Sequence, residues 1–131
     1  MRNYIYIDGF NFYYGAVKDT LYKWLNFKKL FEYLLDSSHQ ILSIKYFTAM
    51  VTGKIDHDQP IRQKTYIRAL KKYVPEISVY YGKFLSHNIF KPLAYPINKN
   101  PFGKDIKFVQ VIKTEEKGSD ANLAVHLLND A

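Results

Sequence analysis

The sequence contains no cysteine, which excludes disulfide bridges and zinc sites built from thiolates. It has no apolar run close to the roughly 18 residues that a membrane-spanning helix requires. Its first residues also lack the charged and then apolar layout of a signal peptide. The patterns of a P-loop, of a glycine-rich dinucleotide-binding turn and of a Ser-His-Asp triad are missing as well. These absences predict a cytoplasmic protein without a membrane partner.

The composition is that of a small, basic globular protein. A length of 131 residues predicts one domain over residues 1–131, and an apolar content of 47% provides for a core. The 19 Lys and Arg residues against 12 Asp and Glu residues produce a net charge of +7. Such a balance favours a polyanionic partner, with nucleic acid preferred over a membrane surface.

The hydrophobic pattern predicts an α/β protein. β-forming residues and helical spacing predict strands over 4–7, 41–51 and 77–85, a fourth antiparallel edge strand over 106–112, and helices over 12–17, 26–35, 61–73 and from 120 onward. Asn26 is expected to cap its helix, and Pro60 suits a first helical turn. Residues 86–105 hold three of the five prolines and predict a functional or mobile loop. The order predicts a three-layer sandwich on a mainly parallel sheet, with ligands beyond the carboxyl ends of the strands.

Two aspartates stand at the ends of predicted elements. Asp8 follows the first strand directly, and Asp120 follows Glu116-Lys117-Gly118-Ser119 in the first turn of the last helix. We expect Ser119 to cap this helix and the side chains of Leu123, Ala124, Leu127 and Leu128 to form its buried face. Because Mg²⁺ prefers carboxylate oxygens, the two acids predict one metal site built from both ends of the chain. The alternative for Asp120 is simple compensation of the helix dipole.

The two motifs together carry a resemblance. Tyr-Ile-Asp-Gly-Phe-Asn at 6–11 and Glu-Lys-Gly-Ser-Asp-Ala-Asn-Leu-Ala at 116–124 resemble the NYN family of PIN-like ribonucleases. The resemblance implies a PIN-like Rossmannoid fold, a Mg²⁺ or Mn²⁺ cofactor, and endonucleolytic RNA cleavage by a metal-activated water. It further implies that Asp8 and Asp120 are catalytic metal ligands and that Asn11 orients a ligand or water.

The chain departs from this family's pattern at its end. Gly9 and Gly118 match the family's motifs, where they would permit close backbone approach. However, the family continues into a further strand with more acidic residues, whereas this chain stops at Ala131. A C-terminally shortened domain is therefore expected, with an incomplete site and an exposed edge on the first strand that predicts self-association. The alternative function is a catalytically incomplete PIN-like module that binds RNA or a protein partner.

Basic and aromatic residues predict where RNA would bind. Five basic residues occupy the helix predicted over 61–73, and they are Arg62, Lys64, Arg68, Lys71 and Lys72. Such groups contact phosphates independently of sequence, although a solvated helix face is the alternative interpretation. Phe90, Tyr95 and Phe102 lie in the predicted loop over 86–105, where they would stack on single-stranded bases.

Overall fold

The computed structural model describes residues 1–93 and 107–131, and its centre is a four-stranded sheet. The strands are β1 (Arg2–Asp8), β2 (Gln40–Ala49), β3 (Ile77–Pro92) and β4 (Phe108–Lys117), which lie in the order β1-β2-β3-β4. β1, β2 and β3 are parallel, and β4 pairs antiparallel with β3. The predicted mainly parallel sheet with an antiparallel strand at one edge is confirmed.

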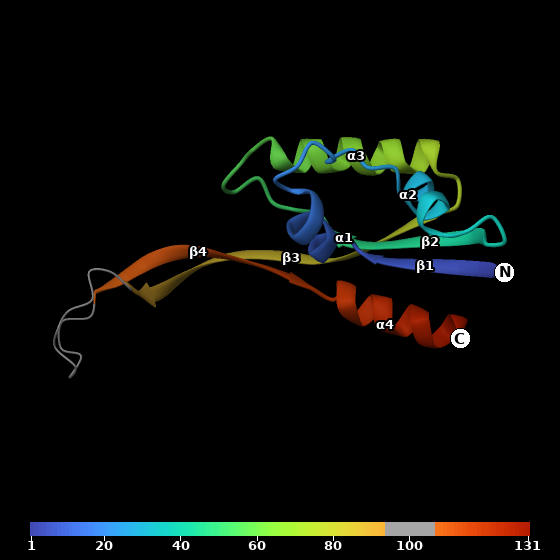
Figure 1. Ribbon diagram of the computed structural model, residues 1–131. Helices are drawn as coiled ribbons and strands as arrows, with labels where there is room; N and C mark the ends of the chain where they lie inside the picture. The colour runs from blue at the N-terminus through green and yellow to red at the C-terminus, as the bar shows by residue number, and fades with distance from the viewer. Residues whose placement is uncertain (94–106) are drawn as a thin grey trace.

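Helices cover both faces of this sheet (Figure 1). The helical elements are α1 (Gly9–Phe12), the π-helix η1 (Tyr13–Val17), α2 (Phe27–Leu34), α3 (Gln59–Tyr73) and α4 (Ser119–Asp130). α2 and α3 lie over one face, and α4 lies under the other (Figure 1). The predicted three-layer α/β sandwich is therefore confirmed. Among the described helices, none combines the length and apolar character needed to cross a membrane.

Local sequence signals explain where the helices begin. The Asn26 side chain accepts a hydrogen bond from the backbone N of Lys29 at 3.2 Å, which confirms the predicted cap of α2. Pro60 lies in the first turn of α3. The first helical turn begins at Gly9, earlier than the helix predicted over 12–17, because the Asp8 side chain caps it directly after the strand.

The core lies between the sheet and the layer that contains α2 and α3. Successive side chains of a strand point to opposite faces, so β2 serves both layers. Its Tyr46 side chain packs against Phe27 of α2, with ring centres 5.5 Å apart. Phe47 points to the opposite face and packs against the His126 ring of α4, with ring centres 5.4 Å apart. Both layers are thus anchored on one central strand.

β3 and β4 continue past the body of the protein as a two-stranded arm (Figure 1). The loop predicted over 86–105 is therefore wrong in its first part, because residues up to Pro92 pair with β4. Pro92 ends the strand, where its lack of an N–H costs little. The rest of that predicted loop and the start of the strand predicted over 106–112 fall on residues 94–106, outside the described residues. The turn predicted over 116–119 is reduced to Gly118, which has a φ of 91°.

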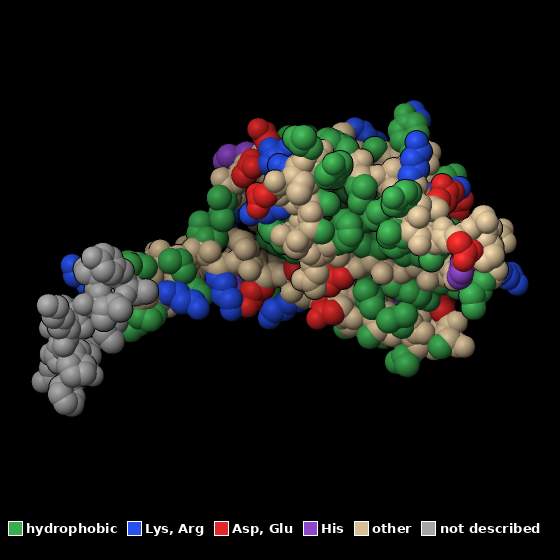
Figure 2. All heavy atoms as spheres, viewed as in Figure 1, with side chains coloured by type: hydrophobic (Ala, Val, Ile, Leu, Met, Phe, Trp, Pro, Cys, Tyr) green, Lys and Arg blue, Asp and Glu red, His purple; other side chains and the backbone are tan. Residues whose placement is uncertain are grey.

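The arm carries its basic residues on one face. Opposite residues of an antiparallel pair share a face, and Lys83 stands opposite Lys117 while His87 stands opposite Lys113. The other face holds Phe84 and Asn88, which approach the body. The ring centres of Phe84 and of Phe10 in α1 lie 5.7 Å apart. Figure 2 shows basic side chains along the lower side of the arm.

The junction between β3 and α4 leaves no room for a side chain at Gly82. A Cβ there would lie 2.6 Å from the carbonyl oxygen of Lys117 and 2.9 Å from the backbone N of Ser119. We expect Gly82→Ala to lower the free energy of unfolding by about 1–3 kcal/mol, because backbone atoms must move. Urea denaturation measures this change. Gly15→Ala is the control, since no atom lies within 4 Å of the added Cβ; equal loss in both variants would contradict the prediction.

Candidate functional site

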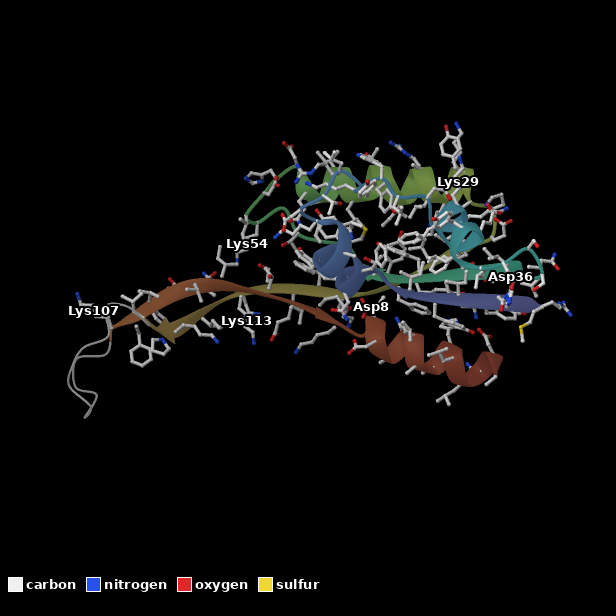
Figure 3. The ribbon with its side chains drawn as sticks, in the orientation of Figure 1. Asp8, Lys29, Asp36, Lys54, Lys107 and Lys113 are labelled. Carbon is white, nitrogen blue, oxygen red and sulfur yellow. The ribbon has the colours of Figure 1, made fainter. Side chains whose placement is uncertain are left out.

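Asp8 and Asn11 are brought together at the end of β1. The Asp8 carboxylate accepts one hydrogen bond from the backbone N of Asn11 at 2.9 Å and another from Asn11 Nδ2 at 2.7 Å. Figure 3 shows Asp8 where β1 meets α1. The carboxylate therefore fixes the entry of the chain into α1.

Asp120 is exposed in the first turn of α4, where it compensates the helix dipole. Ser119 is buried, and its side chain makes no capping hydrogen bond. The expected role of Ser119 falls to Glu116, whose Oε1 accepts from the backbone N of Ser119 at 3.0 Å. Within residues 1–93 and 107–131, no group of three or more acidic or histidine side chains is arranged to hold a metal ion.

The five basic residues of α3 do not share one face. At about 100° per residue, Lys64, Arg68, Lys71 and Lys72 fall within an arc of about 100°, and Arg62 lies on another flank of the helix. Arg62 forms an ion pair with Asp56 at 2.5 Å. No finding tests contact between these residues and RNA, which stays a prediction. Of the aromatic residues expected to stack on bases, Phe90 lies in β3, whereas Tyr95 and Phe102 fall outside the described residues.

A cleft of about 350 Å³ opens between η1, the segment that follows it, and α3. Strand β2 forms its floor through Tyr46 and Thr48. Six of its lining side chains are aromatic: Phe10, Tyr13, Tyr14, Trp24, Tyr46 and Tyr66. π-helical turns are frequent at functional sites, and here η1 supplies Tyr13 and Tyr14.

The aromatic walls are held in place by their own contacts. On the η1 side, the Tyr14 ring lies 5.6 Å from Phe10 and 5.1 Å from Tyr13. Trp24 meets the Tyr66 ring of α3 edge to face, with ring centres 5.7 Å apart. The Tyr66 hydroxyl donates to the carbonyl oxygen of Leu25 at 2.7 Å, which ties the segment after η1 to α3. The walls are thus preformed surfaces on which a planar ring can stack.

The charged residues of the cleft are mostly basic. Lys18, Lys23 and Arg62 line it together with one carboxylate, that of Asp56. A hydrogen bond from Arg62 holds the pKa of the Asp56 carboxyl below its usual range, and the same pair raises the pKa of Arg62. Three cations against one ionised carboxylate leave an excess of positive charge, so the cleft favours an anionic ligand with a flat apolar body.

Sequence reasoning missed this cleft. Nothing in the spacing of its aromatic residues distinguishes the wall of a cleft from a core. One signal was present: Phe10, Phe12, Tyr13 and Tyr14 are four aromatic residues within five positions, directly after the first strand. Such density beside the carboxyl end of a parallel strand marks the edge of the sheet where ligands bind.

The opposite face of the sheet meets α4 through polar groups. Asp130 accepts a hydrogen bond from the Tyr6 hydroxyl at 2.5 Å and forms an ion pair with Lys45. The ring centres of His126 in α4 and Tyr80 in β3 lie 4.2 Å apart. These contacts connect α4 to β1, β2 and β3.

The predicted buried face of α4, formed by Leu123, Ala124, Leu127 and Leu128, is therefore largely wrong. Leu123 is partly buried, but Ala124 is exposed and Leu128 is 79% exposed. The reason is that the sheet presents Lys45 and Tyr6 to this helix, so the polar side of α4 turns inward.

The comparisons with known proteins point away from RNA cleavage. No family model matches the chain, and no solved structure matches it. The chain is 34% identical to the 6-hydroxy-3-succinoylpyridine 3-monooxygenase HspA of Pseudomonas putida, over an alignment of 149 positions. The alignment covers all of this chain and 48% of that protein, so the chain spans about half the length of the curated relative it matches.

This similarity corrects the predicted function. The similar protein is named for an oxidation, so the prediction of a metal-dependent ribonuclease, a hydrolase, is wrong. The predicted Mg²⁺ or Mn²⁺ cofactor is wrong for the same reason, since monooxygenation needs redox chemistry and not a metal-activated water. NYN membership, the catalytic roles of Asp8, Asn11 and Asp120, the RNA partner and self-association stay predictions.

The Asp130 contacts make the stability of the protein depend on pH. Hydrogen bonds from Lys45 and then Tyr6 lower the pKa of Asp130 in the folded protein. Stability from this carboxylate is therefore present above its unfolded pKa and is lost as pH falls through the lowered folded pKa. We expect Asp130→Asn to reduce the free energy of unfolding at pH 7, and the gap to the wild type to close in acid. Asp19→Asn is the exposed control; a gap independent of pH would contradict this assignment.

Proposed function

We propose that this chain forms the substrate-binding site of a monooxygenase that acts on a hydroxylated aromatic or N-heteroaromatic carboxylic acid. The observation that carries the proposal is the cleft between η1 and α3, which is lined by six aromatic residues and has an excess of positive charge. The name of the similar protein supports it, because that protein acts on a hydroxypyridine that bears a succinoyl chain. Such a molecule combines a flat ring with a carboxylate.

The ring would lie between the aromatic walls. A volume of about 350 Å³ is at the lower end of the usual range for ligand sites, which suits one small aromatic acid. Tyr14 and Trp24 both line the cleft, and each is braced by a second aromatic ring. Stacking in this slot would orient the ring and displace water from it.

The carboxylate would bind at the basic side of the cleft. Arg62 is the best placed group, because a planar guanidinium matches a carboxylate and carries five N–H donors. Its bond to Asp56 runs through Nη2, so Asp56 also fixes the plane of the guanidinium. Lys18 and Lys23 add positive charge to the cleft.

In a monooxygenation, one atom of dioxygen enters the substrate and the other leaves as water, with two electrons supplied by a reduced flavin or nicotinamide. The described residues do not fit a dinucleotide form of such a group. The first strand-to-helix turn has one glycine in place of the glycine-rich pattern that lets a pyrophosphate approach. The space beside that glycine, Gly9, is occupied by the Tyr46 side chain, because a Cβ at Gly9 would lie 2.5 Å from Tyr46 Cζ. The contribution proposed for this chain is to bind and orient the substrate.

Binding of 6-hydroxy-3-succinoylpyridine, measured by isothermal titration calorimetry, tests this proposal. We expect Arg62→Gln to weaken binding by about 10- to 100-fold, because a hydrogen bond to a charged group is lost. Arg68→Gln removes the same charge from the solvent-facing flank of α3 and is expected to change the affinity by less than about twofold. Equal losses of affinity in the two variants would mean that Arg62 contributes only positive charge and no direct contact with the ligand.

Asp56→Asn separates the ion pair from the ligand contact. This substitution breaks the Asp56–Arg62 pair and leaves the guanidinium in the cleft. We expect the acid to bind as tightly as to the wild type or more tightly, because a competing carboxylate is gone. No binding of the acid to the wild-type chain would overturn the proposed function.

A further inference from the structure

The Tyr46 hydroxyl belongs to the floor of the cleft, where Thr48 is the other β2 residue. Tyr46 is only 7% exposed, yet its side chain lines the cleft. Two other polar groups of the cleft are engaged: Gln63 Nε2 donates to the carbonyl oxygen of Ala49 at 2.8 Å, and the Tyr66 hydroxyl donates to that of Leu25. Among the described residues, no protein group forms a hydrogen bond with the Tyr46 hydroxyl.

The Tyr46 hydroxyl occupies the space that a side chain at position 9 would need. A Cβ at Gly9 would stand 2.5 Å from Tyr46 Cζ and 2.7 Å from its hydroxyl oxygen. The hydroxyl therefore lies directly against the first residue of α1, at a point where Gly9 also lines the cleft. From behind, the Tyr46 ring is supported by Phe27 at 5.5 Å. The group has a fixed position and not a range of rotamers.

The protonation state of Tyr46 determines which ligand groups it can bind. Burial, and then the nearby negative charge of Asp8, raise the pKa of Tyr46 to about 12. The hydroxyl therefore keeps its proton at neutral pH and is available as a hydrogen-bond donor. An acceptor such as an oxygen substituent on the ring can receive this hydrogen bond.

We propose that the Tyr46 hydroxyl donates a hydrogen bond to the ring oxygen of the aromatic acid and so makes the cleft selective for hydroxylated rings. This inference rests on the proposed function and adds a second point of recognition to it. Arg62 binds the carboxylate from α3, and Tyr46 binds the ring oxygen from β2. Two fixed points on different elements set the direction of the ring in the slot, and Gly9 is the positioning residue for one of them.

The test compares two acids that differ by one hydroxyl group, nicotinic acid and 6-hydroxynicotinic acid, by isothermal titration calorimetry on the full chain. We expect the wild type to prefer the hydroxylated acid by roughly three- to tenfold, the value of one hydrogen bond. Tyr46→Phe removes only the hydroxyl. This variant is expected to bind both acids as the wild type binds nicotinic acid, so the preference disappears.

Tyr66→Phe is the matched control, because it removes a hydroxyl from the same cleft that is already bonded to Leu25. It should retain the preference whatever its effect on overall affinity. If Tyr46→Phe also retains the preference, Tyr46 does not contact the ring oxygen, although the proposed function stands. The inference about Tyr46 fails in the same way if the wild type binds both acids equally. If the wild type binds neither acid, the proposed function fails and this inference fails with it.

Discussion

The close approach of the Tyr46 side chain to the backbone at Gly9 is the constraint on which the cleft depends. α1 follows β1 without a loop, so its first residue lies directly over β2, and a Cβ at Gly9 would also meet the carbonyl oxygen of Phe47 at 2.8 Å. The same tyrosine ring continues into the core through Phe27, which in turn meets Phe12 at 5.2 Å. Core packing and the floor of the cleft are therefore one set of contacts, and neither can change alone.

Strand β2 separates two kinds of chemistry. Its alternating side chains place Tyr46 on the side of α3 and Lys45 on the side of α4. Lys45 is 11% exposed along its side chain, and its charge is matched by Asp130. A partly buried cation with a fixed partner specifies how α4 sits on the sheet, whereas apolar contacts alone would allow it to slide or rotate. The layer that contains the cleft and the layer that closes the opposite face of the sheet are thus held by different forces.

The elements of the body could be predicted because their signals are local. Asn26 caps its helix through a residue three positions away, and Pro60 suits a first turn wherever it occurs. The arm could not be predicted in this way, since β3 continues to Pro92 only because β4 pairs with it. The orientation of α4 was missed for a similar reason: Asp130 turns inward to meet Lys45, 85 positions earlier in the chain.

The candidate site shows the same difference between features with a local signal and features that depend on distant contacts. Asp8 was singled out because it directly follows the first strand, and the structure shows a specific local role in which its carboxylate holds Asn11. A carboxylate after a strand is compatible with metal binding and with helix capping alike, so its catalytic role stays a prediction.

The π-helix η1 determines how such a cleft can change over evolution. Lys18 bonds back five residues to Tyr13, one more than in an α-helix. Loss of a single codon there would restore ordinary helical spacing and rotate the preceding residues by about 100°. Tyr14 would then turn away from its neighbours on the wall, so one small deletion could remove ligand binding while leaving the sheet untouched.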